Sequence, residues 1–205
     1  MVHTATSLNA SLDALAAAEP GFARVIETHG RPEPRLSDPG VATLMRTIVG
    51  QQVSVAAARS MWAKLEGEFG SPPDLARLLA ASDEDLRALG QSRQKAGYLR
   101  SLAGLVSSGD LDLANLPADD EQAIELLTRV KGIGRWSAEI YLLFAEGRGD
   151  VWPAGDLAVQ IEVGRLLGLA ERPSEKQLRA LAEAWRPHRG AAAVLAWHSY
   201  HAPPL

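Results

Sequence analysis

Apolar residues recur every three or four positions along most of this 205-residue chain. Between residues 41 and 50, for example, Val41, Leu44, Met45, Ile48 and Val49 fall on one face of a helix. No stretch of the sequence alternates between apolar and polar residues as a half-buried strand would. We therefore predict an all-α protein, with helices over residues 8–18, 20–29, 41–50, 55–69, 74–80, 82–89, 93–107, 118–129, 134–145, 156–167, 174–185 and 190–198.

Glycine and proline residues mark where these helices are interrupted. Residues 30–40 hold three prolines and two glycines, which is typical of a connection between helices. A second loop of this kind covers residues 147–155. We expect two helical lobes. The central lobe covers residues 41–145 and ends in a helix–hairpin–helix over 118–145, and the second lobe combines residues 1–40 with 146–205.

The composition excludes several kinds of chemistry. The chain has no cysteine, which rules out disulfides, thiolate zinc sites, iron–sulfur clusters and a thiol nucleophile. The histidines show no metal-binding pattern; they are His3, His29, His188, His198 and His201. No apolar run approaches the roughly 20 residues of a membrane span, and the first residues lack a signal-peptide pattern. We expect a cytoplasmic protein that does not contact a membrane.

The segment Lys131-Gly132-Ile133-Gly134 predicts an anion site. Two glycines around one aliphatic residue allow a tight turn and a close approach of the backbone to another molecule. The helix that follows would offer its unpaired N–H groups beside the glycines, where a nucleic-acid phosphate is the expected occupant. Arg129, Lys131 and Arg135 add positive charge around the turn. The net charge of −4 argues mildly against nucleic-acid binding, but phosphates respond to the local field.

Three segments and one aspartate together resemble the motifs of a known family. The segments are residues 48–56 (IVGQQVSVA), 132–138 (GIGRWSA) and 184–189 (AWRPHR) with Trp197 beyond it, and Asp156 opens a helix after the loop Trp152-Pro153-Ala154-Gly155. Together they resemble the helix–hairpin–helix DNA glycosylase superfamily, and within it the 3-methyladenine DNA glycosylase II group. Too few residues precede Val41 for the additional N-terminal β-containing domain of long bacterial members, so we expect a compact form.

The resemblance implies a fold and an activity. It implies two helical lobes with the helix–hairpin–helix at the cleft between them. It also implies a monomeric enzyme that flips alkylated purines, such as 3-methyladenine and 7-methylguanine, out of double-stranded DNA and hydrolyses the N-glycosidic bond in base excision repair. The enzyme would be associated with the nucleoid when bound to DNA. No cofactor would be required, although in this superfamily hairpin carbonyls hold Na⁺ or K⁺; by position these belong to Thr128, Val130 and Ile133.

Asp156 is the candidate catalytic residue. Cleavage of the N-glycosidic bond builds positive charge on the sugar, and a fixed carboxylate can stabilise that charge and orient a water molecule. The alternative is that Asp156 is an ordinary helix N-cap in front of Leu157. The two roles are compatible, because a capping bond also fixes the direction of the carboxylate.

Other residues have candidate roles in binding the base or the strand. Trp136 and Trp197 are candidates for stacking on an extruded base, Ile140 replaces an aromatic residue of the superfamily's base pocket, and Tyr141 is its neighbour. The alternative for both tryptophans is a place in the core, which we predict for Trp62 and Trp185. The candidate DNA-binding residues are Gln51, Gln52, Arg93, Lys95, Lys131, Gly132, Ile133, Gly134, Arg135 and Arg189.

The two glutamines interrupt two apolar helices, so their amides are candidates for entering the duplex from the minor groove and bonding the orphaned base. Gln52 stands where relatives place an apolar wedge, and the alternative is that both are polar residues between helices.

Two other functions remain open. A non-catalytic helix–hairpin–helix module would bind DNA structure without cleaving a base. A bifunctional glycosylase–lyase would need an amine nucleophile, and relatives that nick the strand carry a lysine where this chain has Trp136. The sequence favours the monofunctional enzyme.

Overall fold

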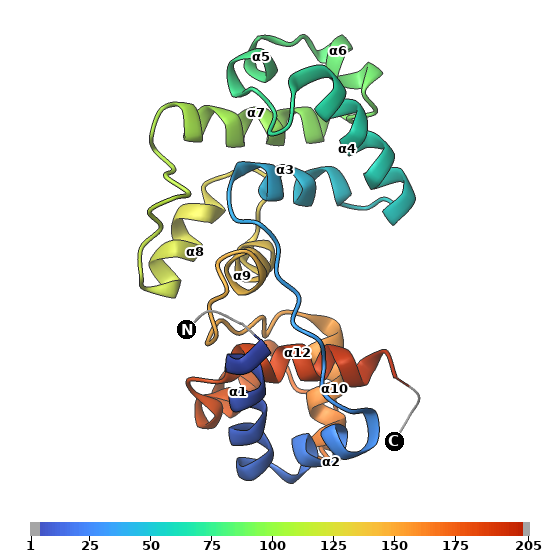
Figure 1. Cartoon of the computed structure of the whole chain (residues 1–205), viewed down its shortest axis with the longest axis vertical. Coiled ribbons are helices and arrows are strands. Elements are labelled where there is room, and N and C mark those ends of the chain that lie inside the picture. Colours follow the sequence, from blue (N-terminus) through green and yellow to red (C-terminus); the bar gives the residue numbers. More distant parts are fainter. Residues whose placement is uncertain (1–4, 203–205) are drawn as a thin grey trace. The chain divides into compact units, whose positions relative to one another are not determined.

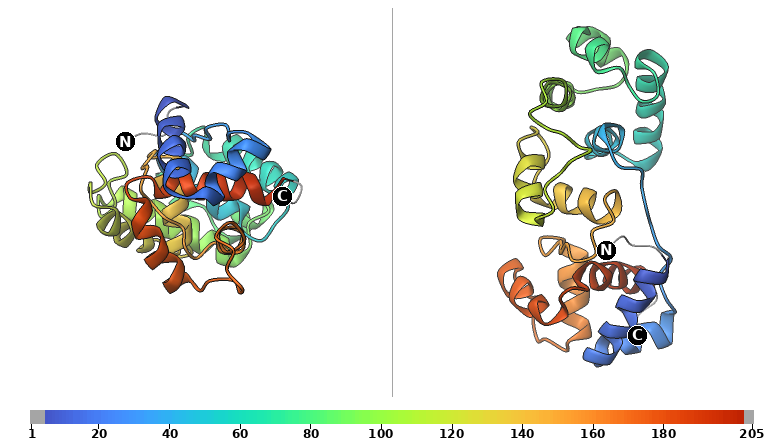
Figure 2. Two further views of the ribbon diagram at one scale, coloured as in Figure 1. Left: turned by 90° about the horizontal axis from the view of Figure 1, so that it is seen from below. Right: turned by 60° about the vertical axis from the view of Figure 1, so that its left-hand side comes forward.

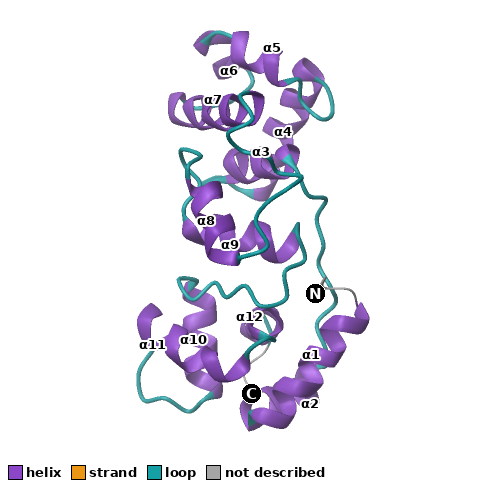
Figure 3. Ribbon diagram, turned by 90° about the vertical axis from the view of Figure 1, so that its left-hand side faces the viewer, coloured by secondary structure: helices purple, strands orange, loops and turns teal. Residues whose placement is uncertain are grey.

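A computed structural model describes residues 5–202 of the chain, and within that range every regular element is a helix (Figure 3). The all-α prediction is confirmed. His3 lies outside the described residues. The α-helices are α1 (Ala5–Ala18), α2 (Pro20–His29), α3 (Val41–Gly50), α4 (Val55–Phe69), α5 (Leu75–Ala80), α6 (Asp83–Ala88), α7 (Arg93–Ser107), α8 (Asp120–Thr128), α9 (Arg135–Phe144), α10 (Leu157–Leu166), α11 (Glu175–Leu181) and α12 (Arg189–Tyr200), with a short 3-10 helix η1 (Ala182–Trp185).

Most differences from the predicted helices lie at N-termini. The periodicity places Asp74, Ser82, Asp156 and Ser174 at the first helical position, but in the structure each is an N-cap with extended backbone angles. Their side-chain oxygens accept the N–H group three residues later, which a residue inside the helix cannot do. The predicted helix over 174–185 was wrong in its second half, where the chain tightens into η1.

The chain forms two compact units. Unit 1 combines residues 1–36 with 142–205, and unit 2 covers residues 37–141. Both boundaries lie four residues before the predicted ones at 41 and 145. At the second boundary the reason is a ring contact: Phe144, at the end of α9, packs against Trp197 of α12 with ring centroids 5.7 Å apart. That contact assigns the end of α9 to unit 1.

Unit 1 is built around α12. This helix packs against α1, α2 and α10 (Figures 1 and 2), and residues 190–196 are all buried. Five of these seven residues are glycine or alanine, which are too small to fill a core alone, so neighbouring helices approach closely and large rings fill the remainder. Trp185 lies edge-on to both Phe22 and Trp152, with centroids 5.0 and 5.6 Å apart. The prediction that Trp185 is a core residue is confirmed.

Unit 2 is built around α3. Leu44, Met45, Ile48 and Val49 are buried where α3 packs against α4 and α7 (Figures 1 and 2). Trp62 of α4 is also buried, as predicted. The core therefore fixes both the end of α3 and the start of α7, which are the two places where candidate site residues lie.

Two exclusions follow from the described residues. None of the helices between residues 5 and 202 combines the length and apolar content that crossing a bilayer requires. In the same range no three His, Asp or Glu side chains are arranged to hold a metal ion.

Candidate functional site

The hairpin turn of unit 2 depends on Gly132. Its φ of 84° is in the left-handed region, and a Cβ added there would overlap the ring of Tyr98 on α7. Ile133 is buried and its N–H group donates to the Val130 carbonyl at 3.0 Å, while the Lys131 N–H group donates to Ser101 Oγ at 3.1 Å. These contacts fix the turn to α7.

The anion site predicted at the hairpin therefore has fewer available N–H donors than the sequence suggested. The Lys131 and Ile133 N–H groups are used within the protein. Gly134 is exposed, and a Cβ added to it would meet nothing within 4 Å. Because α9 starts directly after this glycine, which has no side chain to cap it, the start of α9 stays the candidate position for a phosphate.

The cations around the hairpin differ in their surroundings. Lys131 is exposed. Arg135 forms ion pairs with Glu121 at 2.5 Å and with Glu139 at 3.0 Å, and the hydrogen bond that it donates to Glu121 raises the pKa of Arg135 above its ordinary value. Arg135 is thus largely neutralised by its own protein, and its contact with a phosphate stays a prediction. Arg93, in the first turn of α7, is exposed and keeps its predicted role.

Two other predicted phosphate ligands are structural. Lys95 is only 9% exposed and its Nζ donates to the Val49 carbonyl at 2.7 Å. Arg189 donates to Asp150 from Nε at 2.9 Å and from Nη2 at 3.0 Å, and Nη1 donates to Glu183 at 3.1 Å. The predictions for Lys95 and Arg189 were wrong, because both side chains bridge segments of their own unit.

The two glutamines between α3 and α4 have different environments. Gln51 is half-buried, and its Nε2 donates to the Gly132 carbonyl at 2.8 Å. Gln52 is exposed and has a φ of 56°, the only positive φ among the described residues other than glycine. Gln51 therefore ties the turn to the hairpin, whereas Gln52 is presented outward.

Sequence reasoning missed the apolar character of the same turn. Val53 is 38% exposed and Val55 is 76% exposed, on either side of the N-cap Ser54. Exposed valines beside an outward glutamine suit contact with base edges or sugars in a minor groove. The signal was present in the sequence, because Val-Ser-Val places apolar residues outside the predicted helix face.

In unit 1, Asp156 is the N-cap of α10, and its carboxylate is held from two sides. Oδ1 accepts the Val159 N–H group at 3.0 Å and the Trp197 indole N–H group at 3.1 Å. The preceding loop is also fixed, since the Asp156 N–H group donates to the Pro153 carbonyl at 2.9 Å and Gln160 Nε2 donates to the Ala154 carbonyl at 2.8 Å. The capping role is confirmed, and the geometry leaves Asp156 half-buried with a defined orientation.

Trp197 donates a hydrogen bond from its indole N–H group to the Asp156 carboxylate. Its ring also borders a cavity of about 230 Å³, together with Phe144, Arg31, Arg35 and His198. Glu33 also lines this cavity and Arg31 is ion-paired with Asp13, so the charges around the cavity neither favour nor exclude a cationic ring. The stacking of Trp197 on a base stays a prediction, and its observed contact is with the carboxylate.

The remaining base-pocket candidates lie on α9. Trp136 is 47% exposed, so the alternative that it is a core residue was wrong. Ile140 lies one turn further on the same face and is half-buried. Tyr141 is buried and its hydroxyl accepts the Gly40 N–H group at 2.8 Å. We therefore remove Tyr141 from the base pocket and keep Trp136 and Ile140.

Known proteins resemble this chain in sequence and in structure. DNA-3-methyladenine glycosylase 2 of Escherichia coli is 32% identical over 165 residues, which cover 76% of this chain and 56% of that protein. The crystal structure of a DNA-3-methyladenine glycosidase from Bacillus halodurans has a TM-score of 0.85 and 32% identity, over 93% of this chain and 89% of that one. The Schizosaccharomyces pombe 3-methyladenine DNA glycosylase in complex with abasic DNA has a TM-score of 0.78 and 27% identity, over 92% and 95%.

The family assignment follows from a match to a family over more than half of the chain. The chain spans little more than half the length of the E. coli relative but nearly all of the two structures. Residues 45–187, which include the hairpin, the α3–α4 turn and Asp156, match the family described as HhH-GPD superfamily base excision DNA repair protein. The chain belongs to the HhH-GPD superfamily of base excision DNA repair proteins.

Proposed function

We propose that this protein is a monofunctional DNA glycosylase that releases alkylated purines, such as 3-methyladenine and 7-methylguanine, from double-stranded DNA. The observation that carries the proposal is the carboxylate of Asp156, which is held by the Val159 N–H group and the Trp197 indole. A carboxylate with a fixed orientation is what stabilisation of a cationic sugar requires. The names of the E. coli and S. pombe relatives support the choice of substrate.

The reaction needs one carboxylate and one water molecule. As the bond between the base and C1′ breaks, its electron pair leaves with the base, which is already cationic when alkylated. Asp156 stabilises the positive charge on the sugar and accepts a proton from the water whose oxygen bonds to C1′. The products are the free base and an abasic site. Alkylation makes the base a better leaving group, and stacking on Trp136 would add cation–π attraction of roughly 0.5–2 kcal/mol.

Strand binding in this proposal depends on the backbone. The first-turn N–H groups of α9, beyond Gly134, would hold a phosphate, and the exposed Lys131 and Arg93 would contact the same backbone. Gln52 would occupy the space left by the extruded nucleotide, with Val53 and Val55 against the groove. A solved relative bound to abasic DNA supports such a complex.

A monovalent cation at the hairpin is part of the proposal. The carbonyl oxygens of Thr128, Val130 and Ile133 would be its ligands. The Val130 oxygen already accepts the Ile133 N–H group at 3.0 Å, and its second lone pair would serve the ion. The ion would neutralise part of the phosphate charge. No other cofactor is proposed, and we propose a monomer that acts in the cytoplasm on nucleoid DNA.

The proposal has a direct test. Methylated duplex DNA is incubated with the protein, released bases are separated by chromatography, and the DNA is then treated with alkali. We expect free 3-methyladenine and 7-methylguanine, and alkali-dependent breaks at purines. Binding without any released base would instead support a non-catalytic hairpin module. A protein–DNA adduct trapped by borohydride would support a bifunctional lyase, against which Trp136 argues because it is not an amine.

A further inference from the structure

Lys95 occupies a position that is costly for a lysine. It lies in the first turn of α7, where its N–H group donates to the N-cap Ser92 Oγ at 3.2 Å. A positive side chain there opposes the dipole of α7. The side chain is also buried, and burial lowers the pKa of Lys95 below its ordinary value. In the described part of the chain no carboxylate forms an ion pair with it.

The contact that Lys95 does make is at the end of another helix. Its Nζ donates to the Val49 carbonyl at 2.7 Å, in the last turn of α3. The last carbonyls of a helix lack partners within the helix and carry the negative end of its dipole. Lys95 thus caps α3 directly before Gln51 and Gln52, the turn in which the backbone becomes left-handed.

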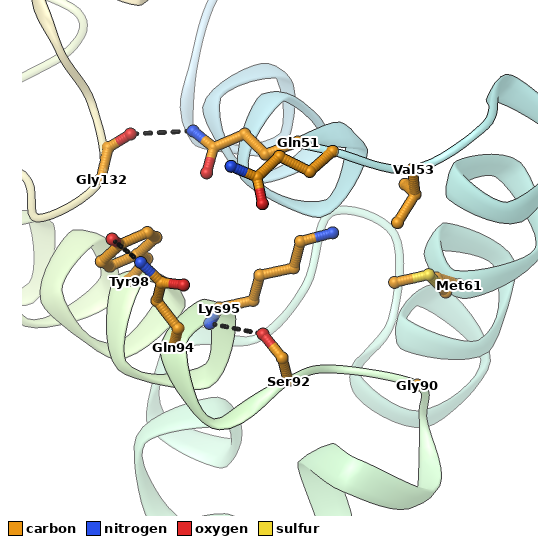
Figure 4. Close-up of a pocket in the computed structure, with 10 residues that line it drawn as sticks. Gln51, Val53, Met61, Gly90, Ser92, Gln94, Lys95, Tyr98 and Gly132 are labelled. Atoms are coloured by element: carbon orange, nitrogen blue, oxygen red, sulfur yellow. Dashed lines mark hydrogen bonds between the residues drawn. The ribbon is translucent and has the colours of Figure 1, made fainter.

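The same turn is attached to the hairpin on its other side. Gln51 Nε2 donates to the Gly132 carbonyl, and the hairpin in turn rests on α7 through Tyr98 and Ser101. Figure 4 shows Gln51 directed at Gly132, with Lys95 extending from α7 toward the turn across a pocket of about 400 Å³. Contacts therefore connect α7 to the end of α3, the turn after α3 to the hairpin, and the hairpin back to α7.

We propose that Lys95 is a positioning residue that holds the α3–α4 turn in register with the hairpin, so that Gln52 enters the duplex when the hairpin binds the strand. This inference rests on the proposed function. Lys95 does not touch DNA in this account. It acts through Val49 and Gln51 on the outward residue Gln52. Burying the ammonium group costs free energy, and this cost is offset because the α3–α4 turn needs no rearrangement when the protein binds DNA.

The test compares Lys95→Met with Lys95→Arg and with Lys64→Met. Lys64 is exposed on α4, so its substitution removes the same charge from unit 2 without touching the turn. Each protein is mixed with a duplex that carries an abasic site next to 2-aminopurine, whose fluorescence rises when it is unstacked. Affinity for undamaged duplex, single-turnover base release and thermal midpoint are measured in parallel.

We expect Lys95→Met to lose most of the fluorescence rise and to release base about tenfold more slowly at saturating enzyme. Its affinity for undamaged duplex should stay within about twofold of the wild type, since the hairpin donors are unchanged. Its thermal midpoint should fall by no more than about 3 °C, because removing a buried cation compensates for the lost hydrogen bond. Lys95→Arg should recover much of the fluorescence, and Lys64→Met should match the wild type.

Several outcomes would overturn the inference. One is a wild-type fluorescence rise and rate in Lys95→Met. Another is a loss of rate that merely follows a large drop in thermal midpoint. If Lys95→Met does not fold, Gln51→Ala breaks the opposite contact and must show the same loss of fluorescence. If the wild type itself releases no base, the proposed function fails, and the fluorescence of the variants still decides the role of Lys95.

Discussion

Two helices of this protein, α9 and α10, begin directly after a glycine-containing loop. They differ in whether a side chain caps their first turn. In unit 1, α10 is capped by its own carboxylate, Asp156. In unit 2, α9 follows Gly134, which has no side chain to offer. The first helix end carries a fixed negative charge and would repel a phosphate, whereas Gly134, at the start of α9, carries no capping carboxylate. In the proposed function, this difference places base release at the start of α10 in unit 1 and strand binding at the hairpin of unit 2.

The largest effect is expected for Asp156→Asn. Asparagine caps a helix nearly as well as aspartate, so stability should hold, but the negative charge opposite the sugar is lost. We expect single-turnover release of 7-methylguanine to fall by about 10²–10³-fold, with binding to abasic DNA preserved. Asp74→Asn is the matched control, because Asp74 caps α5 through the Arg77 N–H group at 3.1 Å and has no proposed role. Near-normal release by Asp156→Asn would remove this carboxylate from the mechanism.

The next effect is expected for Gly134→Asp, which gives α9 the same kind of cap that α10 has. The added carboxylate should occupy the first-turn donors and weaken binding to every duplex about tenfold, whatever the sequence. Gly134→Ala is the control, because the site has room for a methyl group. A loss confined to one lesion, or an equal loss in the alanine variant, would count against a phosphate site here. Gel-shift titration with damaged and undamaged duplexes distinguishes these results.

A smaller effect is expected for Trp197→Phe. Phenylalanine keeps an aromatic ring against Phe144 but removes the indole N–H group that donates to Asp156. We expect the single-turnover rate to fall about fivefold at unchanged DNA affinity, because the carboxylate loses a hydrogen bond that helps to fix its orientation. An unchanged rate would show that the Trp197 hydrogen bond is not needed to set that orientation.

The smallest effect is expected for Lys131→Ala. Lys131 is exposed beside the hairpin and would make one phosphate contact. Its removal should reduce the slope of log affinity against log salt concentration by about 1, with the same loss for all sequences. The ion-paired Arg135 provides the contrast: Arg135→Ala should change this slope less than Lys131→Ala. The reverse order would mean that the Arg135 ion pairs open when DNA binds.

The sequence predicts local features of this fold well. Helical periodicity locates the helices, and the capping box that the structure contains joins Ser82 and Asp85, which are only three residues apart. Asp156 is identified as a helix start by the residues next to it. Such features depend on contacts within a few residues, where the sequence alone carries the geometry.

Long-range contacts explain what the sequence could not predict. Trp197 bonds Asp156 from 41 residues away, and Lys95 bonds Val49 from 46 residues away. A pattern within one helix does not reveal such partners. For Lys95 there was one local signal, since it shares a helix face with Leu99 and Leu102, both of which are buried. The positive residues of the sequence, judged by charge alone, therefore overestimate how many cations are available to bind DNA.

In this account the start of α10 serves base release and the start of α9 serves strand binding. These separate roles are tested most directly by measuring two quantities on both Asp156→Asn and Gly134→Asp. The quantities are the dissociation constant for abasic duplex and the single-turnover rate of base release at saturating enzyme. The account predicts a crossed result, in which Asp156→Asn loses rate and keeps affinity, while Gly134→Asp loses affinity and keeps rate. If both variants lose the same quantity, the two helix ends do not have separate roles and the account is contradicted.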